Sequence, residues 1–432
     1  MKEVISSPKH LRGCLSVPGD KSISHRALIL NALGEGTSVV SGLSSGQDVL
    51  STKGILQNIG IKISNETQEG SYTITGGKGN YQESPVILDA GNSGTSMRLI
   101  SGLLAGLDIF SVLSGDESLN SRPMGRVIEP LTKMGATILG RNDNSLAPFA
   151  INGGNLQGIQ YEMPVASAQV KSCLLIAGIN ASEPTTLIQP AVSRDHTELM
   201  LKAMGGNLSS DGLELTLHPS ELQTIDVVVP GDISSAAFWI IAGLCHPDAQ
   251  LTIQNIGINP SRTGILTALN MMGAESTLRL TSSRIQGGEP VADIEVSSCQ
   301  LKGVELSGEL IPLLIDEIPI LAIAACFAEG TTVIKDAAEL RVKESDRIAT
   351  TVEMVKSLGG QIEPTEDGMI IEGVGELHGA ECNSYNDHRL AMSSAIAGLL
   401  SSGETKIINP ESASISYPSF WNQAHNLMNG NL

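Results

Sequence analysis

The hydrophobic positions along the chain recur in six similar segments. Each segment has a polar or small-residue lead, an apolar run rich in Ala, Leu and Ile, a glycine-containing break, and then β-branched residues typical of a strand. Equivalent points follow one another at about 65 to 82 residues, so six units fill the 432 residues. The segments are residues 20–40, 91–113, 167–188, 231–253, 316–334 and 386–408.

This pattern predicts an α/β protein with buried helices. The apolar runs are hydrophobic on nearly every face of a helix, which is typical of helices enclosed by other elements. Short strands and glycine breaks, such as the pairs at 205–206 and 359–360, separate the helices. We therefore expect a two-domain inside-out α/β barrel, with helices buried and sheets outside.

Two turns of nearly the same sequence divide the repeats into two groups. "SVPGD" at 16–20 and "VVPGD" at 228–232 lie about 212 residues apart, and each contains the Pro-Gly pair of a turn. We interpret them as crossings between two domains of three repeats each. The predicted domains are residues 20–230 and a discontinuous domain of 1–19 plus 231–432, with the functional site in the cleft between them.

Composition and charge exclude several classes of function. Apolar residues make up 41% and charged residues 17%, as in ordinary globular proteins. A net charge of −19 and only 3% aromatic residues argue against nucleic-acid binding. The six cysteines are widely spaced and no apolar run is long enough to span a membrane, so we expect reduced thiols and a cytoplasmic location. A small anion would need a local cluster of positive charge.

The first segment begins with such a cluster. Residues 20–26, "DKSISHR", place Lys21, Ser22 and Arg26 at the predicted start of a helix. The first turn of a helix leaves backbone N–H groups unpaired and carries a partial positive charge, so it attracts anions. The cluster indicates a phosphate or carboxylate site, and the alternative is an ordinary capped helix with a solvated first turn.

Two further segments begin in a similar way. "AGNSGTSMR" at 90–98 offers Gly94, where an anion can approach the backbone closely, and "VASAQVKS" at 165–172 offers Ser167 and Gln169. A single Ser or Asn at a helix start is usually only a cap. Because several such starts occupy equivalent repeat positions, we favour a shared anion-binding site.

Positive charges also gather outside these helix starts. "NSRPMGR" at 120–126 sets Arg122 in what reads as a structured loop, and the alternative is a surface arginine. In "RVKESDR" at 341–347, Lys343 and Arg347 would share one face of a helix. The alternative for that stretch is a salt-bridged, solvent-exposed surface.

The last two segments add acidic groups. Asp316 and Glu317 precede the fifth apolar run, which is normal for a helix start, but Asp316 occupies the repeat position where other segments carry site-facing polar groups. The sixth segment begins with Asp387, a plausible cap, followed by Arg389. Acids therefore accompany the cations of the candidate site.

Together these motifs resemble one family, 5-enolpyruvylshikimate-3-phosphate synthase, also called 3-phosphoshikimate 1-carboxyvinyltransferase. The resemblance covers the chain in family order, from "PGDKSISHRALIL" at 18–30 to "SYPSFW" at 416–421. It implies six βαβαββ units, three per domain, that close around two anionic substrates. The family transfers the enolpyruvyl group of phosphoenolpyruvate to shikimate 3-phosphate and releases phosphate, a step towards chorismate and the aromatic amino acids.

The resemblance also implies which residues bind each substrate. Shikimate 3-phosphate would contact Lys21, Ser22, Arg26, Ser167, Ala168, Gln169, Arg194, Asp316 and Lys343. Phosphoenolpyruvate would contact Lys21, Gly94, Arg122, Gln169, Arg347 and Arg389.

The implied chemistry needs a base for the 5-hydroxyl and an acid for the methylene carbon of phosphoenolpyruvate. Asp316 is the candidate base, and Glu344 and Lys21 are candidates for proton transfer at carbon. The division of roles among the three stays open. The resemblance implies no metal, no organic cofactor and a monomer.

Three positions depart from the common family pattern. Ile415 stands where many members have a lysine, Arg194 where some have tyrosine, and Ala168 where others have serine. These departures are typical of a divergent, glyphosate-tolerant-like branch.

Three other functions fit the sequence less well. UDP-N-acetylglucosamine 1-carboxyvinyltransferase shares the fold, but it typically has a Lys-Asn pair at the first helix start and a reactive cysteine in a loop; here Ser22 follows Lys21, and residues 115–126 contain no cysteine. A non-catalytic anion-binding scaffold would tolerate amides in place of Asp316 and Glu344. A dehydrogenase is disfavoured because no G-x-G-x-x-G motif with a downstream acid occurs at a strand-to-helix turn.

Overall fold

The first strands of the chain belong to the same unit as its second half. The computed structural model describes residues 2–65, 70–286 and 288–430. They form two units, each with its own hydrophobic core. Unit 1 comprises Met1–Pro18 and Pro230–Leu432, and unit 2 is Gly19–Val229.

The described residues of unit 2 form three four-stranded sheets with one shared pattern. In each sheet the first two strands run parallel and the other neighbours run antiparallel. In sheet order the strands are β14 (Val227–Val228), β3 (Gly36–Ser41), β5 (Tyr72–Gly76) and β4 (Lys62–Asn65); β6 (Leu88–Asp89), β7 (Phe110–Ser114), β9 (Leu146–Asn152) and β8 (Thr137–Gly140); and β10 (Gln160–Glu162), β11 (Thr185–Ile188), β13 (Glu214–Leu217) and β12 (Leu208–Asp211).

Unit 1 repeats the pattern, with one sheet a strand shorter in the described part of the chain. Each sheet again joins a parallel pair to antiparallel neighbours. The strands are β2 (Leu11–Ser16), β15 (Ala249–Gly257), β17 (Glu289–Ser297) and β16 (Leu278–Gln286); β18 (Glu305–Leu306), β19 (Thr331–Ile334), β21 (Met369–Glu372) and β20 (Gln361–Pro364); and β22 (Glu381–Asn383), β23 (Glu404–Ile408) and β1 (Lys2–Ser6).

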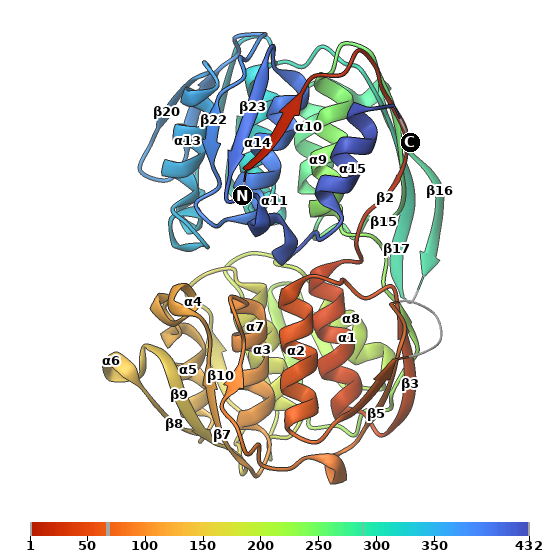
Figure 1. Cartoon of the computed structure of the whole chain (residues 1–432). Helices are drawn as coiled ribbons and strands as arrows, with labels where there is room; N and C mark the ends of the chain where they lie inside the picture. Colours follow the sequence, from red (N-terminus) through yellow and green to blue (C-terminus); the bar gives the residue numbers. More distant parts are fainter. Residues whose placement is uncertain (1, 66–69, 287, 431–432) are drawn as a thin grey trace. The chain divides into compact units, whose positions relative to one another are not determined.

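An almost completely buried helix directly precedes the second strand of each parallel pair along the chain. Every residue of the fifth of these helices is buried, as its uninterrupted apolar sequence predicts. Figure 1 shows these helices inside each unit, with strands flanking them. The prediction of an inside-out α/β fold with buried helices is confirmed. The helices are α1 (Lys21–Leu33), α3 (Gly94–Ala105), α7 (Ala168–Gly178), α9 (Ile233–Cys245), α12 (Ile318–Cys326) and α14 (His388–Leu400).

The other helices are shorter or buried on one face only. The second helix of a repeat buries part of its surface, as in α2, where Val49, Ile55 and Leu56 are buried and Leu50 is exposed. The longer ones are α2 (Gln47–Asn58), α5 (Gly125–Lys133), α8 (His196–Ala203), α10 (Gly264–Met271), α13 (Arg347–Ser357) and α15 (Phe420–Met428). The short ones are α4 (Glu117–Ser121), α6 (Arg141–Asn144), α11 (Ile311–Leu314) and the 3₁₀ turns η1 (Lys78–Asn80), η2 (Ala274–Ser276), η3 (Gly308–Leu310), η4 (Ala338–Val342) and η5 (Pro410–Ile415).

The Pro-Gly turns mark a strand exchange. Strand β2 precedes α1 along the chain but pairs with β15 of unit 1, whereas β14 precedes α9 but pairs with β3 of unit 2. The turn at Gly19 requires glycine, because a Cβ there would lie 1.8 Å from the carbonyl oxygen of Gly42. The two turns are therefore the points at which the chain passes from one unit to the other.

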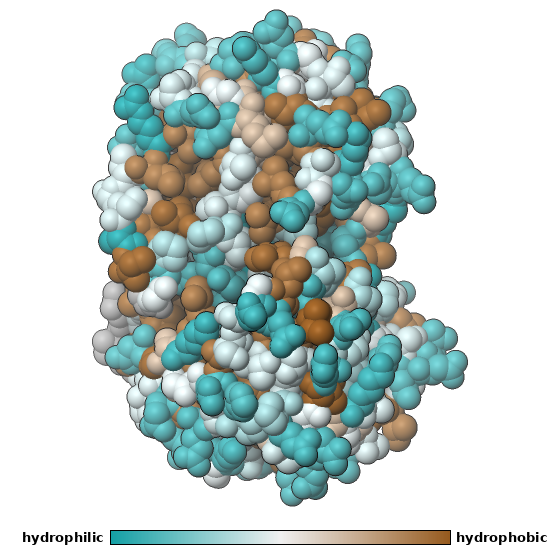
Figure 2. All heavy atoms as spheres, turned by 180° about the vertical axis from the view of Figure 1, so that it is seen from behind, coloured by the Kyte–Doolittle hydropathy of each residue, from teal (hydrophilic) through white to brown (hydrophobic). Residues whose placement is uncertain are grey.

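The surface carries polar and apolar side chains side by side. Figure 2 shows hydrophilic and hydrophobic residues interspersed over one face of the molecule. None of the helices in the described ranges combines the length and hydrophobicity needed to cross a membrane. All six cysteines lie within those ranges and none forms a disulfide.

Candidate functional site

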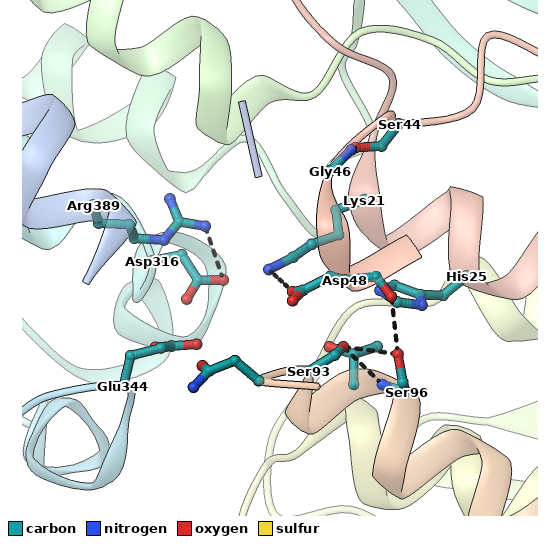
Figure 3. A network of polar contacts seen from close by, with 12 residues as sticks. Lys21, His25, Ser44, Gly46, Asp48, Ser93, Ser96, Asp316, Glu344 and Arg389 are labelled. Carbon is teal, nitrogen blue, oxygen red and sulfur yellow. Dashed lines mark hydrogen bonds and ion pairs between the residues drawn. The ribbon is translucent and has the colours of Figure 1, made fainter. Parts of the chain in front are cut away.

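Lys21 begins helix α1 and faces a carboxylate of the same unit. The helix starts here because the Asp20 side chain caps it, accepting a hydrogen bond from the Ile23 N–H at 2.8 Å. The Lys21 Nζ lies 3.0 Å from Oδ2 of Asp48, in the first turn of α2 (Figure 3). Both side chains are largely buried. The carboxylate of Asp48 thus fixes the orientation of the Lys21 ammonium group.

The serines before α3 and α7 are caps. The Ser93 hydroxyl accepts from the Ser96 N–H at 3.1 Å, and the Ser167 hydroxyl accepts from the Val170 N–H at 3.4 Å. The capping interpretation is therefore correct for both serines. A serine cap keeps its own O–H available as a donor, so capping and anion binding are compatible at Ser167.

Gln169 links the starts of α3 and α7. Its Nε2 donates to Thr95 at 2.9 Å, and its Oε1 accepts from Arg98 at 2.5 Å. The neighbouring Ala168 and Ser167 are half-buried at the same helix start.

Gly94 lies beside two guanidinium groups. A Cβ at Gly94 would be 2.9 Å from Nη1 of Arg98 and 3.6 Å from Nη1 of Arg122. Arg122 is positioned by Asn92, whose side-chain oxygen accepts from it at 2.6 Å. Arg98 was missed by the sequence analysis, although it stands one helical turn after Gly94 on α3. Two positive charges therefore lie beside the start of α3.

Arg26 is buried within unit 2 and joins three helices. It is 2% exposed and donates to Thr197 of α8 and Ser172 of α7, both at 2.6 Å, and to the carbonyl of Ser22 at 2.9 Å. Arg26 thereby orients the start of α1, including Ser22. Arg194, which is half-buried, lies in the segment that leads into α8.

A second buried cation of unit 2 was missed. Lys171 is 1% exposed and lies 2.6 Å from the carboxylate of Glu198. Burial lowers the pKa of Lys171, although the charge of Glu198 opposes this. No sequence signal separates Lys171 from a surface lysine, because its ion-pair partner Glu198 lies on another helix, α8.

In unit 1, Arg347 gathers three carboxylates. It is 1% exposed and lies 2.8 Å from Asp387, 2.6 Å from Glu344 and 3.4 Å from Asp316. Burial disfavours its positive charge, but these carboxylates outweigh that effect and raise the pKa of the guanidinium. The structure thus brings three of the predicted site residues together, with Asp387 as their common anchor.

Arg389 completes this cluster from α14. Its guanidinium lies 3.8 Å from Asp316 and 3.8 Å from Glu317 (Figure 3 shows the contact with Asp316). The predicted cap is confirmed, because the Asp387 side chain accepts from the Arg389 N–H at 2.9 Å. Asp316 therefore has guanidinium groups on two sides.

Residues 341–347 do not form one helix, so Lys343 and Arg347 do not share a helix face. The turn η4 ends at Val342, Lys343 is extended with φ −83° and ψ −154°, and α13 begins only at Arg347. The cause is Asp346, whose side chain caps α13 by accepting from two backbone N–H groups at 3.1 Å. The exposed-surface alternative fits the Arg341–Asp346 pair but not the buried Arg347.

Another buried polar group in unit 1 was not anticipated. Arg262, 3% exposed, donates to Asp232 at 3.1 Å and to Ser234 at 2.6 Å, and Ser234 donates in turn to Glu317. Arg262 lies just before α10, whereas the repeat pattern pointed only to the starts of the six apolar helices, so it gave no reason to select Arg262. Through Ser234 and Glu317, this group reaches the side of Arg389.

Comparisons with known proteins identify close relatives over the whole chain. The model of the family described as EPSP synthase (3-phosphoshikimate 1-carboxyvinyltransferase) matches residues 5–424. The chain is 52% identical over 414 residues to the 3-phosphoshikimate 1-carboxyvinyltransferase of Synechococcus elongatus, covering 95% of this chain and 92% of that one. EPSP synthase from Acinetobacter baumannii has a TM-score of 0.87 at 42% identity, covering 99% and 98%. The enolpyruvyl transferase NikO from Streptomyces tendae, at 18% identity and a TM-score of 0.80 over 98% and 96%, is similar in fold alone.

Proposed function

Because this chain belongs to the EPSP synthase family, we propose that it transfers the 1-carboxyvinyl group of phosphoenolpyruvate to the 5-hydroxyl of shikimate 3-phosphate, releasing phosphate in aromatic amino acid biosynthesis. The observation that carries the proposal is 52% identity to a carboxyvinyltransferase over 95% of the chain. The proposal includes a cytoplasmic location and a monomeric protein.

Shikimate 3-phosphate is assigned mainly to the start of α7 and its surroundings. The uncapped N–H groups of a helix start suit a phosphate. On α1, Arg26 orients Ser22 by donating a hydrogen bond to its backbone carbonyl. In unit 1, Lys343 and Asp316 would contact the same substrate. The proposed contacts are Lys21, Ser22, Arg26, Ser167, Ala168, Gln169, Arg194, Asp316 and Lys343.

Phosphoenolpyruvate is assigned to the groups around Gly94 and to the arginines. Arginine binds carboxylate and phosphate groups bidentately, so several guanidiniums suit a substrate that carries both. A side chain at position 94 would crowd the neighbouring guanidinium of Arg98, since a Cβ would lie 2.9 Å from it. The proposed contacts are Lys21, Gly94, Arg122, Gln169, Arg347 and Arg389.

The reaction requires three proton movements around one addition and one elimination. The methylene carbon of phosphoenolpyruvate gains a proton, the 5-hydroxyl adds to the neighbouring carbon and loses its proton, and a tetrahedral ketal forms. Loss of a proton from the new methyl group then expels phosphate and restores the double bond. We assign the hydroxyl proton to Asp316, and Glu344 and Lys21 share the transfers at carbon.

The first test is the release of inorganic phosphate by the purified protein. We expect release from phosphoenolpyruvate with shikimate 3-phosphate and none with UDP-N-acetylglucosamine as acceptor. Release only with the nucleotide sugar would instead assign the chain to the other carboxyvinyltransferase reaction. If the protein binds phosphoenolpyruvate and shikimate 3-phosphate but releases phosphate with neither acceptor, the result would favour the non-catalytic scaffold. Ile415 would then be the first position to examine as the cause.

A second prediction concerns alkaline pH. Burial lowers the pKa of Lys343 below its usual 10.5, and the charge of Arg347 adds to this although Asp316 opposes it. Lys343 therefore loses its positive charge at a lower pH than an exposed lysine does. We expect the KM for shikimate 3-phosphate to begin rising below pH 10.5, and Lys343→Arg to move that rise to higher pH because arginine stays charged.

The matched control for this change is Lys356→Arg, which alters a surface lysine paired with Glu363. It should leave the pH profile of KM unchanged. If Lys343→Arg gives the same alkaline profile as the unmodified protein, the charge of Lys343 does not contribute to binding shikimate 3-phosphate.

A further inference from the structure

A buried chain of hydrogen bonds crosses the starts of three helices in unit 2. His25 Nδ1 of α1 lies 2.7 Å from the Thr52 hydroxyl of α2, which lies 2.7 Å from the Ser96 hydroxyl of α3. The Ser96 hydroxyl then donates to the backbone carbonyl of Asp48 at 3.0 Å (Figure 3). His25, Thr52 and Ser96 are 0% exposed, and Asp48 is 7% exposed.

The direction of the protons in this chain is determined by its last member. A carbonyl only accepts, so the Ser96 hydroxyl donates its proton to the carbonyl of Asp48. The Ser96 hydroxyl also lies 2.8 Å from the Ser93 hydroxyl, and it has no second proton to donate. Thr52 must therefore donate to Ser96. With its proton committed, Thr52 accepts from His25, so the imidazole carries its proton on Nδ1.

His25 is consequently a neutral ring with one tautomer. Burial lowers its pKa well below the usual value, and the charges of Lys21 and Arg26 add to this. Its Nε2 has no hydrogen-bond partner among the described residues. Leaving this buried acceptor unpaired costs free energy. The Nδ1 tautomer is nevertheless retained, because the hydrogen bond to Thr52 requires the proton on Nδ1.

The chain forms a closed loop with Lys21. It begins at His25, one turn after Lys21 on α1, and ends on Asp48, whose carboxylate lies 3.0 Å from the Lys21 Nζ. Apolar side chains at 52 and 96 would pack between the helices without polar groups to satisfy. Hydroxyls at these two buried positions therefore indicate a requirement beyond helix packing.

We propose that the chain His25–Thr52–Ser96–Asp48 positions the Lys21 ammonium for the carboxyvinyl transfer, an inference that rests on the proposed function. Ser96 fixes the backbone of Asp48, and the Asp48 carboxylate fixes the ammonium. Thr52 and Ser96 are positioning residues, since they reach the substrates only through Lys21.

The test removes one hydroxyl group from the hydrogen-bond chain and replaces the residue by one of the same shape. Thr52→Val should lower kcat/KM about fivefold, the effect of losing a hydrogen bond worth about 1 kcal/mol. Thr52→Ser keeps the hydroxyl and should restore kcat/KM to within about twofold of the unmodified enzyme. Thr332→Val is the matched control, because the Thr332 hydroxyl is equally buried, has no partner within the described ranges and lies on β19 of unit 1.

A second readout does not depend on catalysis. Nitrogen NMR of protein with ¹⁵N-labelled histidine should show His25 protonated on Nδ1 and bare on Nε2, and Thr52→Val should shift the proton towards Nε2. A wild-type proton on Nε2 overturns the inference, as does a normal kcat/KM in Thr52→Val. If the unmodified protein transfers no carboxyvinyl group while the Nδ1 tautomer is observed, the failure belongs to the proposed function.

Discussion

The Asp316→Asn variant is expected to fold normally and to release phosphate roughly two to four orders of magnitude more slowly, the typical contribution of a general base. A base must be ionised to accept the hydroxyl proton, and Asp316 lies 3.4 Å from Arg347 and 3.8 Å from Arg389. The amide keeps the size and hydrogen-bonding shape of the side chain but cannot accept that proton. The measurement is kcat for phosphate release with both substrates saturating.

Comparing the changes in kcat and in KM distinguishes a role of Asp316 in proton transfer from a role only as a negative charge near the substrates. If Asp316 acts as the base, kcat falls and the KM for each substrate changes much less. Glu309→Gln is the control, since Glu309 is an exposed acid of the same unit and should leave both constants unchanged. An Asp316→Asn variant with wild-type kcat would remove Asp316 from the mechanism and support the anion-binding scaffold.

The Asp387→Asn variant is expected to lose at most about 3–5 kcal/mol of unfolding free energy, because it removes the fully buried counter-ion of Arg347 and leaves only the less buried Glu344 and Asp316 to compensate that charge. Asp387 is 0% exposed, and its carboxylate accepts from Arg347 at 2.8 Å and Ser345 at 3.1 Å. Both tryptophans, Trp239 and Trp421, lie in unit 1. Tryptophan fluorescence during urea unfolding therefore reports on the unit that carries the change.

The control and the pH dependence make this prediction specific. Glu363→Gln breaks the exposed pair with Lys356 and should cost less than about 1 kcal/mol. Burial opposes ionisation of Asp387, but Arg347 prevails and lowers its pKa below 3.8. Its stabilisation is therefore present above pH 3.8 and is lost as the pH falls through the lower folded value, so the two proteins should converge in acid. An equal loss at every pH would contradict the ion-pair explanation.

The repeat architecture could be predicted because its signals are local. An apolar run such as residues 318–326 has no polar face, so a buried helix follows from the run alone. Asp387 was recognisable as a cap for the same reason, since capping depends on neighbours in the sequence. Asp346 is also such a cap, but it was not recognised among the alternating charges around it, and its capping of α13 separates Lys343 from Arg347.

Contacts between helices could not be predicted in this way. Thr52 and Ser96 are 44 positions apart, and only the packing of α2 beside α3 places their hydroxyls 2.7 Å apart. Arg262 reaches Ser234 across 28 positions for the same reason. A single sequence specifies which residues are polar, but the choice between a solvated and a buried polar group depends on tertiary packing.

The exchange of β2 and β14 has a consequence for biogenesis. The ribosome makes strands β1 and β2 first, but their partners come much later: Leu11 pairs with Ala249, and Lys2 pairs with Ile408. Every strand of unit 2 is made after β2 and before β15, so unit 2 can be complete while the nascent N-terminal strands are still unpaired. Unpaired strands readily join other chains. This polypeptide therefore most needs protection by chaperones from the translation of residue 16 to that of residue 249, while both strands are unpaired, and β1 stays unpaired until residue 408 is made.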